Sequence, residues 1–241
     1  MNNLKLYGLT IPQKAIYLAE LYSSGSNLNS IGGNIIIEEN VNLDLLEKAI
    51  NIFVKNNDAL RIRIYMENGS PMQYIMPYEP FYLKRVFLKD KSALEKLTDE
   101  TVAFPFNFFD STLFNFTLFK FESGTGGLTL SLHHIISDAW SMSLFVDGII
   151  KIYSDLLNNN SINEDTSNSY LTFVKNEQDY LKSSRFKKDK EFWNSFFTCE
   201  PEYLLISSKK EKNITTKAKR KAFVLSLSLI HISEPTRHAQ I

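Results

Sequence analysis

Two adjacent histidines, His133 and His134, are the side chains of this sequence whose type and spacing are best suited to chemistry. They follow the run 128–132, in which leucine alternates with threonine and serine. This alternation is the period of a half-buried strand, so consecutive side chains at its end point to opposite faces. The two histidines are therefore expected to have different roles.

The strand pattern changes to a helix pattern at Asp138 and Ala139. Apolar residues at helical spacing follow on one stripe: Met142, Phe145, Val146, Ile149, Ile152 and Tyr153. Asp138 is therefore expected at the N-terminus of a helix, where a carboxylate accepts hydrogen bonds from free N–H groups. No further His, Cys or carboxylate stands at metal-ligand spacing from the histidines, so the sequence predicts no metal site.

The segment 133–139, which reads HHIISDA, resembles the HHxxxDG motif of the condensation domains of nonribosomal peptide synthetases. These domains are similar to chloramphenicol acetyltransferase. Flanking segments resemble the family in the same order along the chain: 9–17, 57–63, 169–181 and 186–193. The resemblance extends over roughly residues 6–226.

Two departures from the family pattern affect what can be expected. Ala139 replaces the family's glycine. Its Cβ is expected to narrow the space for any group that must approach the backbone closely at this position. The chain also matches only one of the two lobes that a family domain contains. Residues 1–226 are therefore interpreted as a truncated N-terminal lobe, without the second lobe and its motifs.

The resemblance implies an α+β fold, a chloramphenicol acetyltransferase-like lobe with a mixed β-sheet flanked by helices. In the family two lobes form a V, and phosphopantetheine arms of carrier proteins bring the substrates into the tunnel between them. An amine on the acceptor attacks the donor thioester, and an amide results. The implied partners are peptidyl or acyl carrier proteins, the missing C-terminal lobe and an adjacent adenylation domain, with no cofactor bound directly.

The resemblance also assigns roles to single residues. His134 is the catalytic residue by its position in the motif, as a general base for the amine proton or as a group that orients the amine. Imidazole suits both roles because it titrates near neutral pH. His133 and Asp138 are assigned to structure. Asp138 is expected to pair with Arg61, or alternatively with Arg63, because a buried carboxylate without a partner is costly.

Two other functions remain open. A degenerate lobe that only docks carrier proteins is consistent with Ala139 and the missing half, whereas the intact His134 and Asp138 favour an enzyme. The third function is that of a coenzyme A-dependent acyltransferase whose active site is shared between subunits.

Composition limits the class of protein. At 241 residues and 44% hydrophobic, the chain is long and apolar enough for one large domain or two small ones. Lys plus Arg equals Asp plus Glu, at 27 each, so no net charge favours nucleic acid or an anionic membrane as a partner. Cys199 is the sole cysteine, which excludes an internal disulfide. Neither a signal peptide nor a membrane-spanning run is found, so the expected compartment is the cytoplasm.

The patterns around the motif predict the elements that position it. A helix is expected over about 10–22, where Thr10 and Gln13 have the spacing of a capping box. Further helices are expected over about 43–57, 92–103 and, in two pieces, 170–197. A short buried strand is expected at 34–38 after a loop over 23–33, and further strands at 82–88 and at 60–66, where Arg61 and Arg63 share one face. Asn68 and Gly69 supply the turn of one hairpin, and 113–121 with 128–134 form another.

The end of the chain has a different composition. Residues 209–221 are lysine-rich and are expected to form a solvated loop before a strand near 222–226. Residues 227–241 do not continue the family pattern and resemble read-through of a sequencing adaptor. They are interpreted as a non-native tail without a role in fold or function.

Overall fold

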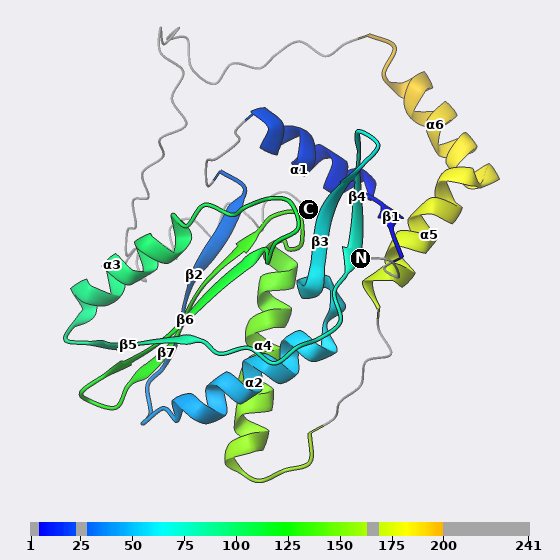
Figure 1. Cartoon of the computed structure of the whole chain (residues 1–241). Coiled ribbons are helices and arrows are strands. Elements are labelled where there is room, and N and C mark those ends of the chain that lie inside the picture. The colour runs from blue at the N-terminus through cyan, green and yellow to red at the C-terminus, as the bar shows by residue number, and fades with distance from the viewer. Residues whose placement is uncertain (1–4, 23–27, 163–168, 200–241) are drawn as a thin grey trace, which may run out of the picture. The chain divides into compact units, whose positions relative to one another are not determined.

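The hairpin that ends in the two histidines lies in the middle of a four-stranded sheet in the computed structural model, which describes residues 5–22, 28–162 and 169–199 (Figure 1). The strands, in spatial order, are β2 (Ser30–Ile37), β7 (Gly126–His133), β6 (Phe114–Phe121) and β5 (Lys84–Leu88). β7 is antiparallel to both neighbours, whereas β5 and β6 are parallel, so the sheet is mixed. The predicted β6–β7 hairpin is confirmed.

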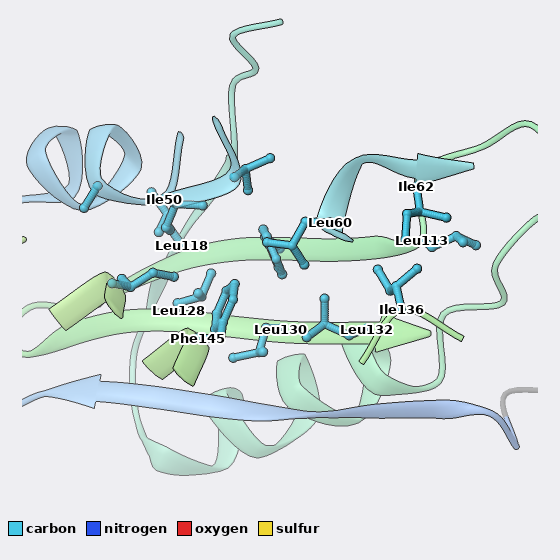
Figure 2. Packing of buried hydrophobic residues seen from close by; sticks show 14 of the residues in the cluster. Ile50, Leu60, Ile62, Leu113, Leu118, Leu128, Leu130, Leu132, Ile136 and Phe145 are labelled. Carbon is cyan, nitrogen blue, oxygen red and sulfur yellow. The ribbon is translucent and has the colours of Figure 1, made fainter. Parts of the chain in front are cut away.

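β7 is buried along its whole length, which corrects the half-buried strand that its alternation predicts. Its leucines point toward α2 (Leu43–Asn56) and α4 (Ala139–Leu157), and Figure 2 shows them packed beside Ile50 and Phe145. On the other face, Thr129 Oγ1 lies 3.2 Å from Thr101 Oγ1 of α3 (Lys91–Val102). The small polar side chains of β7 therefore pack against a second layer of helix, and a period of two cannot reveal that layer.

A smaller sheet has the order β1-β4-β3, with β1 at Tyr7–Gly8, β4 at Ser70–Ile75 and β3 at Ile62–Glu67. The predicted β3–β4 hairpin is confirmed, and Asn68 and Gly69 at its turn have φ angles of 49° and 78°. Such positive values are those of a type I′ turn. The predicted strand 60–66 is shorter than expected, because a 3₁₀ turn, η1 (Asp58–Arg61), occupies its first residues. Arg61 therefore does not share a strand face with Arg63.

β2 is longer than the predicted strand 34–38, because Ser30 and the glycines after it already pair with β7. A Cβ placed on Gly32 would lie 2.3 Å from the carbonyl oxygen of Leu130. Glycine is thus required where the edge strand passes close to β7, although in the sequence it is typical of a loop. β2 is also only partly buried, since it lies at the edge of the sheet.

The first helix, α1 (Ile11–Tyr22), begins with the predicted capping box. The Thr10 backbone N–H donates to Gln13 Oε1 at 3.0 Å, and the Gln13 N–H donates to Thr10 Oγ1 at 3.4 Å. Two further helices, α5 (Tyr170–Lys182) and α6 (Ser184–Phe196), confirm the predicted pair over 170–197. Glu177 of α5 accepts from the backbone N–H of Ile11 at 3.1 Å, so α5 lies against the start of α1.

Three predictions concern residues that the structure leaves undescribed. The lysine-rich loop 209–221, the strand near 222–226 and the non-native tail 227–241 all lie outside the described ranges. Among the helices that are described, none combines the length and hydropathy needed to cross a bilayer.

Candidate functional site

The motif residues lie where β7 turns into α4, and the two histidines differ in their surroundings as their spacing predicts. His133, the last residue of β7, is buried, whereas His134 is half-buried. Asp138 is the N-cap of α4, which confirms its predicted place at a helix N-terminus. The backbone N–H of His134 donates to the carbonyl of Asn29 at 2.7 Å, which fixes the turn against the segment before β2.

His133 connects the motif to α1. Its Nδ1 accepts a hydrogen bond from the Ile135 backbone N–H at 3.1 Å, so in the neutral ring the proton is on Nε2. Nε2 lies 3.4 Å from Glu20 Oε2. Burial lowers the pKa of His133, and the Glu20 carboxylate opposes that shift. The rings of Phe106 and Phe108 pack on the imidazole, with centroids 5.9 and 5.2 Å away. These contacts suit the structural role expected of His133.

His134 is held in one tautomer by its own turn. Its Nδ1 lies 2.8 Å from the carbonyl oxygen of Ser137, and a carbonyl can only accept, so Nδ1 carries the proton. In the neutral ring the lone pair is then on Nε2. Ser137 is fixed in turn, because its hydroxyl donates to the carbonyl of His133 at 3.1 Å. In histidines that act as bases, a hydrogen bond to one ring nitrogen commonly fixes the tautomer and leaves the other nitrogen free to accept a proton.

A pocket of about 590 Å³ lies at this turn, between α1, the start of α4 and α5. Six polar residues line it together with seven apolar or aromatic ones; the polar ones are Thr10, Gln13, His134, Ser137, Asp138 and Ser141. The apolar and aromatic ones are Pro12, Ala15, Ile16, Ile135, Ile136, Tyr170 and Phe173. Most of the surface that the pocket exposes is apolar, and the imidazole of His134 lies at it. Within the described ranges, no cluster of three or more side chains that could bind a metal occurs.

Asp138 does not form the predicted pair with Arg61. Its Oδ1 instead accepts from the Ser141 backbone N–H and from Ser141 Oγ, both at 2.7 Å, and Asp138 is exposed. The prediction assumes a buried carboxylate, which would need a cation. At the helix terminus the free N–H groups and a hydroxyl satisfy the carboxylate in the presence of water.

Arg61 binds backbone carbonyls instead of a carboxylate. Its guanidinium donates to the carbonyls of Val54, Lys55 and Met76, at 3.3, 3.4 and 2.6 Å. Val54 and Lys55 lie in the last turn of α2, where carbonyls lack helical partners and a cation is favourable. The alternative partner, Arg63, donates to the Ile62 carbonyl and to Thr112 Oγ1. Arg61 therefore does not support the motif loop as predicted; it connects the last turn of α2 to Met76, the residue after β4.

Ala139 begins α4, is exposed and is absent from the pocket lining. It is not among the residues with positive φ, so its backbone does not require glycine. The narrower space for a close backbone approach at Ala139 stays a prediction.

Sequence reasoning missed two parts of the site. Glu20, the partner of His133, lies 113 positions away in the chain and is a single acid near the end of an amphipathic helix. Tyr170 and Phe173 line the pocket from α5, and their spacing of three residues only shows that they share a helix face. Such residues become recognisable only when the packing of α5 on α1 is known.

Asp138→Ala is expected to cost about 1 kcal/mol of unfolding free energy, because it removes an N-cap. Arg61→Ala should destabilise the protein independently, since the two residues share no partner. In chemical denaturation, the double variant is expected to equal the sum of the single variants within about 0.5 kcal/mol. A coupling free energy well above that value would be evidence for the predicted ion pair between Asp138 and Arg61.

The cap also makes stability depend on pH. The hydrogen bonds from the Ser141 side chain and backbone hold the pKa of Asp138 below its ordinary value of 3.8. A carboxyl whose pKa is lowered on folding stabilises the folded state above the unfolded pKa and loses this effect as the pH falls through the folded pKa. The difference in melting temperature between the parent and Asp138→Ala should therefore shrink in acid below pH 3.8.

Comparison with known proteins adds the family context. Residues 3–237 match the family model described as condensation domain. The chain is 36% identical over 212 residues to surfactin synthase subunit 1 of Bacillus subtilis (strain 168), and 25% identical over 194 residues to tyrocidine synthase 3 of Brevibacillus parabrevis. These alignments cover 85% and 80% of this chain but only 6% and 3% of the two synthases.

Solved condensation domains share the fold. A mutant of the starter condensation domain of the rhizomide synthetase RzmA, in a form called product-released, superposes with a TM-score of 0.79 at 20% identity. The first condensation domain of the calcium-dependent antibiotic synthetase, in complex with a substrate analogue, gives 0.72 at 22% identity. The chain is covered to 86% and 82%, yet it spans only 48% and 49% of those domains. The α+β fold of the chloramphenicol acetyltransferase type, with a mixed sheet between helices, is thereby confirmed.

Proposed function

The chain belongs to the condensation domain family, and we propose that it is the N-terminal lobe of a domain that forms amide bonds in nonribosomal peptide synthesis. The donor is a thioester on one carrier protein, and the acceptor is an amine on another. Phosphopantetheine arms of the carriers deliver both, without a cofactor bound to the lobe itself. The adenylation domain that loads a carrier and the second lobe are the other partners, and the cytoplasm is the compartment.

The observation that carries the proposal is the fixed tautomer of His134 beside the pocket. The amine nitrogen of the acceptor forms a bond to the thioester carbon, and the tetrahedral species carries a positive nitrogen and a negative oxygen. Nε2 of His134 accepts a proton from that nitrogen. The carbon–sulfur bond then breaks, the amide forms, and the proton passes to the departing thiolate.

His133 and Asp138 act through the position of this imidazole. His133 fastens the motif to Glu20 of α1, and Asp138 fixes the first turn of α4. Neither side chain is assigned a proton in the reaction. The apolar lining of the pocket keeps water from the thioester, which would otherwise hydrolyse.

The test uses the two-lobed domain, meaning residues 1–199 of this chain continued into the second lobe of its parent synthetase. An aminoacyl donor carrier and an aminoacyl acceptor carrier are mixed with it, and dipeptidyl product on the acceptor is measured by mass spectrometry. Product is expected only when both carriers are loaded. If acyl-coenzyme A and a free amine give product and loaded carriers do not, the domain is a coenzyme A-dependent acyltransferase instead.

A further inference from the structure

Two arginines, Arg61 and Arg63, line a second pocket of about 380 Å³. It lies between the end of α2, β3, the start of β6 and the segment 76–83, which connects β4 to β5. It shares no lining residue with the pocket beside His134. Its volume is within the range of sites for small molecules, about 300–1,000 Å³.

Both guanidinium groups retain N–H groups that no described residue accepts. A guanidinium carries five N–H donors. Arg63 uses one on Nη1 for the Ile62 carbonyl and one on Nη2 for Thr112 Oγ1, at 2.9 and 3.0 Å. Arg61 uses three, for the backbone carbonyls described above. Three N–H groups of Arg63 and two of Arg61 therefore remain for water or a ligand.

The charge of the two arginines is only partly balanced. Within the described ranges, neither forms an ion pair with a carboxylate. Burial lowers the pKa of Arg63, and the Tyr74 phenol opposes that shift. The exposed Glu79 is the one carboxylate in the lining, so it offsets one of two cations. A cation that is partly withdrawn from water without an opposite charge is costly, which favours an anion from outside the chain.

Aromatic rings form another part of the lining. Phe114 packs on Phe81 and on Phe116, with ring centroids 5.7 and 4.5 Å apart, and Tyr78 and Tyr82 also line the pocket. Flat heterocycles such as nucleobases stack on aromatic rings and on guanidinium planes. The pocket therefore offers donors for an anion together with surfaces for a ring.

The segment 76–83 has a fixed shape although it is neither helix nor strand. The Asn51 amide of α2 donates to the Phe81 carbonyl at 2.9 Å and accepts from its N–H at 3.0 Å, and Tyr78 Oη donates to the same amide oxygen at 2.9 Å. At the other end, the Met76 N–H donates to the Arg61 carbonyl at 3.0 Å. The wall of the pocket is thus formed before any ligand binds, which lowers the entropy cost of binding.

We propose that this pocket binds a nucleoside monophosphate, with its phosphate on the remaining N–H groups of Arg61 and Arg63 and its base against the aromatic rings. One phosphate carries up to two negative charges near pH 7, which matches two guanidinium groups. The Thr112 hydroxyl accepts from Arg63 and can donate its own proton to a phosphate oxygen. The inference goes beyond the proposed function, because no residue of this pocket takes part in amide formation.

Isothermal titration calorimetry of the 241-residue chain with adenosine monophosphate tests the site. Adenosine lacks the anion and inorganic phosphate lacks the base, so each is expected to bind at least tenfold more weakly. Arg63→Gln should weaken binding of the monophosphate tenfold or more. Arg185→Gln, an equal change of charge at an exposed position of α6 outside the pocket, should leave it unchanged. Absence of saturable binding, or equal affinity for adenosine or for inorganic phosphate, would overturn the proposal.

Two exposed positions keep the test decisive even if Arg63→Gln fails to fold. Glu79→Gln removes the carboxylate that repels the phosphate, so the affinity should rise several-fold, and the gain should shrink at high salt. Thr112→Val should lower the affinity several-fold, because it removes a donor. Melting temperatures without ligand confirm that both variants are folded. If Glu79→Gln binds no more tightly than the parent, the phosphate does not lie in this pocket.

Discussion

His134→Asn is expected to lower amide formation by the two-lobed domain on the order of a hundredfold or more, which is the usual contribution of a general base. The loss follows from the geometry of the imidazole. Nδ1 donates to the Ser137 carbonyl, so the lone pair that can accept the amine proton is on Nε2. An asparagine amide has a donor at the same distance along the side chain as Nδ1, but it offers no base.

The asparagine variant separates chemistry from the shape of the turn. Its amide N–H can replace the bond to Ser137, whereas His134→Ala loses both that bond and the base. Single-turnover rates and melting temperatures are measured for both variants. If the base dominates, the two rates fall alike and only the alanine variant melts earlier. A parental rate in the asparagine variant would remove proton transfer by His134 from the mechanism and leave it an orienting role at most.

The 241-residue chain by itself is expected to form amide at less than about a thousandth of the rate of the two-lobed domain, because one lobe cannot hold two tethered substrates near attack distance. In the two-lobed domain proposed above, it would supply His134 and one wall of the reaction space. Without the opposite wall, water also enters the pocket and weakens every electrostatic contact in it.

The measurement compares both proteins with the same loaded carriers, and the mass of the 241-residue species in solution is determined in parallel. Efficient product formation by a monomer would contradict the half-domain interpretation. Product formed only by a dimer or trimer would instead support a site completed by a second copy of the chain.

The change of period at Asp138 can be read from the sequence, and so can the hairpin at Asn68 and Gly69, because both depend on neighbours in the chain. Local rules also predict the capping box of α1 and the N-cap of α4. The expected catalytic role of His134 comes from the family resemblance and not from these local rules. What these patterns cannot supply is the layer on the far side of β7, since alternation is the same for a strand with one or two covered faces.

The partners of charged side chains are the least predictable part of the site. The sequence predicts a carboxylate partner for Arg61, but its guanidinium donates to two carbonyls at the end of α2 and to that of Met76. It also predicts a buried Asp138, yet this residue is exposed and satisfied by Ser141. The partner of Asp138 is local, since Ser141 is three residues along the chain, whereas the bond from Arg61 to Met76 depends on three-dimensional packing.

Two of the bonds that fix the histidines to the rest of the lobe reach especially far along the chain, from His133 to Glu20 and from His134 to Asn29. A seven-residue graft of HHIISDA onto another scaffold would carry neither acceptor with it. An exchange between synthetases that keeps this geometry must therefore include the chain from the cap of α1 at Thr10 to the pocket residue Phe173 of α5. Recombination points placed inside that unit separate each histidine from its support, even where the motif itself is left untouched.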